Sequence, residues 1–292
     1  MSEESKWVYL KDKFKGIGLR ISRGRVAYRI SLVAPPWTFR FFDKIYKSRV
    51  ITIRHGLAKG FKIRGSPLTT LLFLMGPLTK EEQFLQTLKV KNKSVYDIGA
   101  HIGIITLFFA KAVGEGGMVV AFEPNPESYG ILQENLILNS SRNVRSFRIG
   151  LGNKAHTESL VALRFASGTG TIDQEMQSTI VREPHRKFTV KICPLDQCVQ
   201  EFKIPTPDFV KIDVEGAEYE VLEGMENTIA KCKPTILIEI HGLNFEKSRD
   251  KTKRIIAFLT GYGYHFKHIE TGKSLSTASI ISRPAEGHIL AY

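Results

Sequence analysis

The chain has 292 residues, 42% of them hydrophobic and 24% charged, which is the composition of a globular protein with a full hydrophobic core. Its three cysteines predict neither a disulfide framework nor a zinc site, and they favour a reducing compartment. No apolar run reaches the roughly 18 residues of a membrane-spanning helix, and the acidic start does not resemble a secretory signal. We therefore expect a cytoplasmic protein without an integral membrane span.

The net charge of +13 is concentrated near the amino terminus. Residues 1–66 hold 16 Lys and Arg against four acids, whereas residues 67–292 are almost neutral. Aromatic residues alternate with these bases up to about residue 48. Such a segment can contact an anionic membrane surface, a nucleic acid or another polyanion, or its aromatic residues can pack on the main domain. We predict a basic amino-terminal segment over 1–66, able to bring the protein to a membrane as a peripheral protein, and one main domain over 67–292.

The hydrophobic pattern predicts a hairpin formed by residues 50–53 and 61–63, a helix at 80–88, and from residue 94 a regular alternation of strands and helices. Two further strands, at 160–165 and 188–192, flank a polar insertion, and a strand pair at 265–269 and 288–292 closes the chain. The alternating strands are expected at 94–98, 118–122, 144–149, 209–212 and 235–240, and their helices at about 102–113, from 126 onward, at 217–230 and at 248–259. This order predicts an α/β fold with a mostly parallel sheet and helices on both faces.

Residues 94–103, Ser-Val-Tyr-Asp-Ile-Gly-Ala-His-Ile-Gly, predict a buried strand, a glycine turn and the start of a helix. The two glycines permit a tight turn and a close approach of the backbone to a ligand, which the first N–H groups of the helix would face. Ligands of open α/β sheets bind at the carboxyl ends of the strands. The cofactor-binding residues predicted here are Asp97, Gly99, Ala100, His101 and Gly103.

Glu123 ends the second strand of this series. It follows the glycine turn by about 20 residues, which is where an acid accepts hydrogen bonds from both hydroxyls of a ribose. NAD and S-adenosylmethionine both contain such a ribose. The turn is Gly-x-x-x-Gly rather than the Gly-x-Gly-x-x-Gly of a pyrophosphate site, and Asp97 suits the ammonium of an amino-acid tail. These features favour S-adenosylmethionine as the cofactor.

Four further polar residues lie at or just after the ends of strands four and five, namely Asp213, Glu215, Glu239 and His241. We predict that they form the catalytic group, with Asp213 and His241 as candidate bases for an acceptor hydroxyl that must lose its proton. The two acids after strand four can also stabilise the start of the next helix, and His241 can simply close its strand through a hydrogen bond. Asp213, Glu215 and Glu239 could bind Mg²⁺, but their spacing does not require a metal, and none is predicted.

Four motifs occur in the order typical of one family: Val95–Gly103, Phe122–Asn125, Val210–Glu218 and Ile238–His241. In them the chain resembles the FkbM-type methyltransferases over about residues 94–261. The resemblance implies a Rossmann-like class I methyltransferase fold, S-adenosylmethionine as methyl donor, and Gly99, Gly103 and Glu123 as cofactor residues. It also implies an acceptor hydroxyl on a sugar, a lipid-linked glycan or a secondary metabolite, and it assigns no role to the basic segment.

Strand four is followed by Asp-Val-Glu and not by an Asn-Pro-Pro-Tyr-like segment, which favours oxygen over nitrogen as the methyl acceptor. The expected function is therefore O-methylation of a hydroxyl-bearing acceptor, and the basic segment would suit an anionic or lipid-linked one. Two alternatives stay open. One is an RNA methyltransferase that holds phosphates with the basic segment, and the other is a non-catalytic protein that binds an adenosyl ligand at a membrane surface.

Overall fold

The computed structural model describes residues 50–64, 78–163, 166–173, 177–178, 181, 185–241, 245–275 and 287–292. Most of the basic segment lies outside the described residues, so the predicted roles of that segment and the predicted location in the cell stay predictions. Within the described part of the chain, no helix combines the length and the apolar character needed to cross a bilayer.

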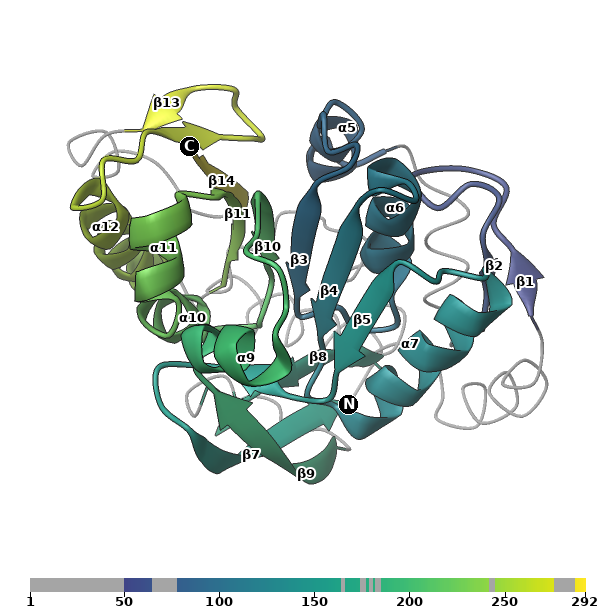
Figure 1. The fold of residues 1–292 in the computed structure, drawn as a ribbon. Coiled ribbons are helices and arrows are strands. Elements are labelled where there is room, and N and C mark those ends of the chain that lie inside the picture. Colours follow the sequence, from purple (N-terminus) through teal and green to yellow (C-terminus); the bar gives the residue numbers. More distant parts are fainter. Residues whose placement is uncertain are drawn as a thin grey trace, which may run out of the picture.

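An eight-stranded sheet forms the centre of the molecule, in the order β13-β12-β14-β11-β10-β3-β4-β5 (Figure 1). The strands from β11 to β5 are parallel, and β14 runs antiparallel between β11 and β12. The bounds are β3 (Ser94–Ile98), β4 (Met118–Phe122), β5 (Val144–Phe147), β10 (Phe209–Ile212), β11 (Thr235–Ile240), β12 (Phe266–His268), β13 (Ser274–Leu275) and β14 (Gly287–Ala291). The strand order reverses between β3 and β10, which places a ligand crevice at their carboxyl ends. The predicted α/β class I methyltransferase fold is confirmed.

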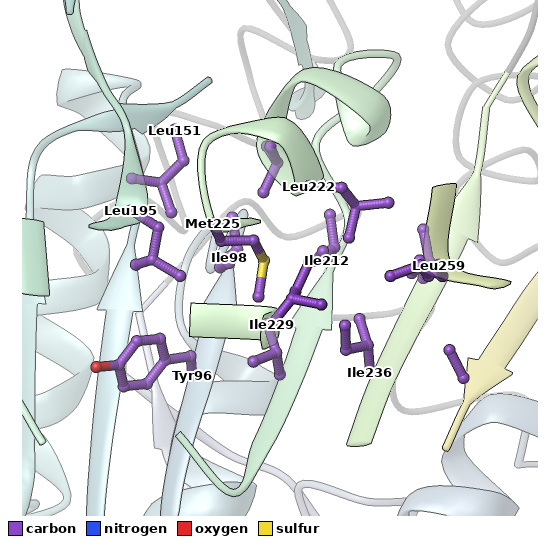
Figure 2. Packing of buried hydrophobic residues seen from close by; sticks show 14 of the residues in the cluster. Tyr96, Ile98, Leu151, Leu195, Ile212, Leu222, Met225, Ile229, Ile236 and Leu259 are labelled. Atoms are coloured by element: carbon purple, nitrogen blue, oxygen red, sulfur yellow. The ribbon is translucent and has the colours of Figure 1, made fainter. Parts of the chain in front are cut away.

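Helices cover both faces of this sheet, because neighbouring residues of each strand point to opposite sides. Val95 packs with Phe109 on the face covered by α5 (Lys80–Leu85), α6 (Ile104–Val113) and α7 (Pro126–Leu138). Tyr96 points to the other face, where Leu195, Met225 and Leu259 join it (Figure 2). The helices of that face are α9 (Leu195–Phe202), α10 (Glu218–Glu223), α11 (Glu226–Cys232) and α12 (Phe245–Thr260).

Side-chain caps mark where α5 and α7 begin. Asn125 caps α7, because its Oδ1 accepts the N–H of Glu127 at 2.9 Å, and Pro126 occupies the first helical position. The single helix predicted at 217–230 is wrong, since α10 and α11 are separate. They meet at Gly224, where a Cβ atom would lie 2.0 Å from the carbonyl oxygen of Gly152.

Two smaller sheets flank the central one. The strands β6 (Gly150–Leu151), β7 (His156–Leu163), β8 (Ala166–Thr171) and β9 (His185–Cys193) form a four-stranded sheet, of which the sequence predicts only β7 and β9. The predicted hairpin forms from β1 (Ile51–Thr52) and β2 (Lys62–Ile63). It packs on α7, where Asn139 Nδ2 donates to the carbonyl oxygen of Lys62 at 2.7 Å. This end of the predicted segment 1–66 thus shares a core with the main domain.

Candidate active site

The glycine turn after β3 forms as predicted, but its N–H groups bond to the protein itself. The N–H groups of Gly99 and Ala100 both donate to the carbonyl oxygen of Phe122 at 3.0 Å. The N–H of His101 donates to Glu123 Oε2 at 2.8 Å, and that of Gly103 donates to the carbonyl oxygen of Ala100 at 2.9 Å. All four N–H groups are therefore bonded within the protein, and they form no cradle for a phosphate. Among them only the N–H of Gly103 belongs to the first turn of the predicted helix 102–113, so the prediction that the first N–H groups of that helix face a ligand is wrong for Gly103 alone.

The two glycines of the turn are required by packing. Gly99 has φ +85°, and a Cβ atom there would lie 1.8 Å from the carbonyl oxygen of Asp213. Gly103 has φ +87°, and its Cβ atom would lie 2.4 Å from Leu132 Cδ1 on α7. Both φ values lie in the left-handed region that favours glycine. Glycine is needed at these two positions so that β10 and α7 can approach the turn. The sequence suggests another reason, the approach of the backbone to a ligand.

A pocket open to solvent, with about 750 Å³ of space including its mouth, lies at the carboxyl ends of β3, β4 and β10. Its walls include Gly99, His101, Glu123, Asp213 and Glu215, all of which the sequence predicts as site residues. Asp97, Ala100, Gly103, Glu239 and His241 are not among its lining residues. The sequence gives no signal for the apolar side chains that complete the walls, which are Ile98, Phe122, Ile149, Leu151, Leu160, Ile172 and Val214. Apolar walls with a few placed polar groups are typical of small-molecule sites.

Glu123 stands at the end of β4 with a buried carboxylate. Its Oε1 accepts the N–H of Asn125 at 2.8 Å, and its Oε2 accepts the N–H of His101 at the same distance. Each oxygen keeps a second lone pair for a ligand hydroxyl. Burial raises the pKa of Glu123 to about 7, against the lowering effect of these two hydrogen bonds. The position and the chemistry fit the predicted contact with a ribose.

Asp97 is buried beside the turn, at the end of β3. Its Oδ2 accepts the hydroxyl of Thr106 at 2.6 Å, while its buried Oδ1 has no hydrogen-bond partner among the described residues. Burial raises the pKa of this carboxyl above its ordinary value. A buried carboxylate oxygen normally accepts a hydrogen bond, and an ammonium that reached Oδ1 would donate the one that is missing.

The ends of β10 and β11 bring the four predicted catalytic residues together. His241 Nδ1 lies 2.8 Å from Glu218 Oε1, which holds the ring in one orientation. Its Nε2 lies 3.7 Å from Asp213 Oδ1, 3.6 Å from Glu215 Oε2 and 3.7 Å from Glu239 Oε1. Burial lowers the pKa of His241, but the surrounding carboxylates, led by Glu215, outweigh it and raise the pKa well above the ordinary value.

A second group of buried ionic residues supports this cluster. Lys211 Nζ lies 2.9 Å from Asp213 Oδ2 and 3.9 Å from Glu81 Oε1. His288 Nε2 lies 3.4 Å from Glu239 Oε2, while its Nδ1 contacts Glu270. The sequence prediction misses Lys211, Glu218 and His288. Only Lys211 has a signal in the sequence, because a lysine inside the apolar strand Phe-Val-Lys-Ile requires a buried partner.

The chain is similar in sequence to known methyltransferases. The model of the methyltransferase FkbM domain matches residues 97–266. Methyltransferase sdnD of Sordaria araneosa is 27% identical over 172 residues, which are 51% of this chain and 66% of that protein. The hexuronic acid methyltransferase AglP of Haloferax volcanii is 30% identical over 155 residues, 50% of this chain and 55% of that protein. The matches thus span less than two thirds of either relative.

Two further proteins are named for the same family. The 31-O-demethyl-FK506 methyltransferase FkbM of Streptomyces tacrolimicus is 24% identical over 192 residues, which cover 58% of this chain and 72% of that protein. The crystal structure of methyltransferase FkbM from Methylobacillus flagellatus aligns with 94% of this chain and 63% of its own, at a TM-score of 0.47 and 15% identity. Because the family model spans more than half of the chain, the protein belongs to the FkbM family of S-adenosylmethionine-dependent methyltransferases.

Proposed function

We propose that the protein transfers a methyl group from S-adenosylmethionine to a hydroxyl of a sugar, glycan, lipid-linked or secondary-metabolite acceptor. One observation supports this most directly. A single pocket is lined by Glu123, suited to a ribose, and by the carboxylates of Asp213 and Glu215, suited to a hydroxyl. The names of two relatives, a hexuronic acid methyltransferase and a 31-O-demethyl-FK506 methyltransferase, agree with a sugar or a secondary metabolite as acceptor.

The residues of the pocket fit S-adenosylmethionine, which supplies a methyl group on a positively charged sulfur when it is bound. The N–H groups of the turn are already bonded within the protein, which suits a ligand without phosphates. Glu123 offers acceptor lone pairs for the ribose. Asp97, which is buried beside the turn and is not among the lining residues, offers a further acceptor for an ammonium at Oδ1.

The acceptor side of the pocket is the wall formed by Asp213 and Glu215. Both carboxylates line the pocket, whereas His241 does not, so they are the nearer acceptors for the proton of a hydroxyl. His241 lies behind them, with its ring held by Glu218. Asp213 and Glu215 hold the hydroxyl oxygen toward the cofactor side of the pocket, and such placement can contribute a large part of the acceleration.

The test is to incubate the full chain with methyl-labelled S-adenosylmethionine and a cell extract fractionated into polysaccharide, lipid, small-molecule and RNA pools. We expect label in polysaccharide, lipid or a small hydroxylated metabolite. Label in RNA alone would overturn the proposal in favour of an RNA methyltransferase. Cofactor binding without label in any pool would overturn it in favour of a non-catalytic protein.

Substituting Glu123 should weaken the binding of S-adenosylmethionine. Glu123→Ala removes the acceptor for the ribose, and a hydrogen bond to a charged group contributes about 1.5–3 kcal/mol, so we expect Kd to rise by about tenfold to a hundredfold. Isothermal calorimetry measures this, with Glu123→Gln as a variant that keeps the shape. Glu115→Ala, at an exposed acid before β4, is the matched control and should leave Kd unchanged. Equal affinities for all variants would refute the ribose contact.

The affinity for the cofactor should also depend on pH through the same carboxyl. Burial raises the pKa of Glu123 to about 7, and ribose hydroxyls donate to its ionised form, so affinity should rise as pH increases through this value and then level off. Between about pH 6 and pH 8 the ionised fraction changes by about tenfold, and Kd should fall by the same factor. Calorimetry at several pH values checks this, and Glu123→Gln should remove the part of the pH dependence that is due to this carboxyl.

A further inference from the structure

We propose that Asp213, Glu239 and His241 bind a divalent transition-metal ion of the Mn²⁺ type at the edge of the pocket. Each residue offers one ligand atom, and these three atoms lie within 4.8 Å of one another. They come from the ends of two adjacent parallel strands, β10 and β11, so the sheet itself sets their spacing. No metal is predicted from the sequence, where Mg²⁺ is an alternative only for the three carboxylates Asp213, Glu215 and Glu239. The site proposed here has His241 in place of Glu215, and it favours a different ion.

In each of the three side chains, the polar atom that does not face the ion contacts a charged or polar group of another residue. Ligands of protein metal sites are normally oriented in this way, by hydrogen bonds from an outer layer of residues. The Nε2, Oδ1 and Oε1 atoms are consequently left facing one another. The three supporting pairs are His241 Nδ1 with Glu218 at 2.8 Å, Asp213 Oδ2 with Lys211 at 2.9 Å, and Glu239 Oε2 with His288 at 3.4 Å.

The distances within the group suit a shared ion better than direct hydrogen bonds. His241 Nε2 lies 3.7 Å from the facing oxygens of both Asp213 and Glu239. A charge-assisted hydrogen bond would bring these atoms to about 2.8 Å. Ligands at about 2.0–2.2 Å from one ion are about 3.0–3.6 Å apart, so a small contraction would complete the coordination.

The donor set decides which ion is favoured. Mg²⁺ prefers oxygen ligands in octahedral geometry. Carboxylates suit Mn²⁺ as well as Mg²⁺, whereas imidazole is a ligand of transition-metal ions, so the mixed set favours a transition-metal ion that also accepts carboxylates. The local charge agrees with a cation, because the carboxylates of Glu81, Glu215 and Glu218 also lie within this network. Lys211 is the one lysine paired with these carboxylates among the described residues.

The position of the site suggests what the ion does. Asp213 also lines the pocket, so an ion on its Oδ1 lies within reach of an acceptor hydroxyl. A coordinated hydroxyl loses its proton more readily, and the nearby carboxylate of Glu215 can receive that proton. This role rests on the proposed function, whereas the binding of the ion does not.

The test measures Mn²⁺ binding to the full chain by electron paramagnetic resonance, after dialysis against a chelator and without cofactor or acceptor. We expect one ion per chain, with Kd raised at least about tenfold in His241→Ala and in Glu239→Gln. The matched control is His156→Ala, which removes an exposed histidine whose Nε2 lies 3.5 Å from Glu158 Oε2 on β7. This variant should bind Mn²⁺ as the wild type does. Circular dichroism of each variant shows whether it is folded.

Failure to bind Mn²⁺ in the wild type would overturn the assignment, as would unchanged binding in both folded site variants. Displacement of Mn²⁺ by an equal concentration of Mg²⁺ would refute the imidazole ligand. The outcome is separate from that of the labelling experiment. Mn²⁺ binding without methyl transfer would support the metal site and refute the proposed function. Methyl transfer by a chain that does not bind Mn²⁺ would support the proposed function and refute the metal site.

Discussion

Gly99→Ala is expected to lower the free energy of unfolding by about 2–6 kcal/mol, because two separate penalties combine there. The φ of +85° costs an alanine about 1–3 kcal/mol. The added Cβ atom would also lie 1.8 Å from the carbonyl oxygen of Asp213, which directly follows β10, and a backbone atom held there cannot move aside as a flexible side chain does. Overpacking of this kind costs about another 1–3 kcal/mol. Urea denaturation measures the total.

Gly60→Ala is the matched control for this prediction. Gly60 has φ +92°, and nothing lies within 4 Å of the Cβ position, so only the penalty for φ applies. Gly60→Ala should lower the free energy of unfolding by about 1–3 kcal/mol, which is less than the decrease expected for Gly99→Ala. Equal losses for the two variants would contradict the argument that the turn is packed against β10.

The sequence predicts the central strands well because each is buried on both faces. β3 and β4 have the predicted bounds, 94–98 and 118–122. β4 is a continuous apolar run, Met-Val-Val-Ala-Phe, and β3 is apolar except for Ser94 and Asp97 and is followed by Gly99. The break between α10 and α11 was not predictable in this way. It depends on the approach of Gly224 to Gly152, a contact between segments far apart in the chain.

In the candidate site, too, the sequence predicts which residues come together but not the contacts between distant segments. The rule that ligands bind at the carboxyl ends of parallel strands is enough to gather Glu123, Asp213 and His241 from three separate segments. It does not show what each group contacts. The N–H groups of the turn are taken up by Phe122 and Glu123, and the histidine ring is held by Glu218, contacts that only the fold determines.

Lys211→Met is expected to destabilise the protein by about 3–5 kcal/mol, because removing one partner of a buried ion pair leaves the other charge uncompensated. The side chain of Lys211 is only 2% exposed, and its Nζ lies 2.9 Å from Asp213 Oδ2. Burial opposes its charge, but Asp213 and Glu81 outweigh this and raise the pKa of Lys211, so the ammonium persists at neutral pH. Urea denaturation in the presence of a chelator gives the loss without any contribution from a bound metal.

Lys93→Met is the control, since Lys93 Nζ lies 2.7 Å from Asp208 Oδ1 but the two side chains are 47% and 41% exposed. Such a pair contributes about 0–1 kcal/mol. The double variant Lys211→Met with Asp213→Asn should recover part of the stability lost in Lys211→Met, because the asparagine leaves no carboxylate to compensate at that position. A double variant as unstable as the sum of the two single ones would show that Lys211 stabilises the fold through packing of its stem and not through Asp213.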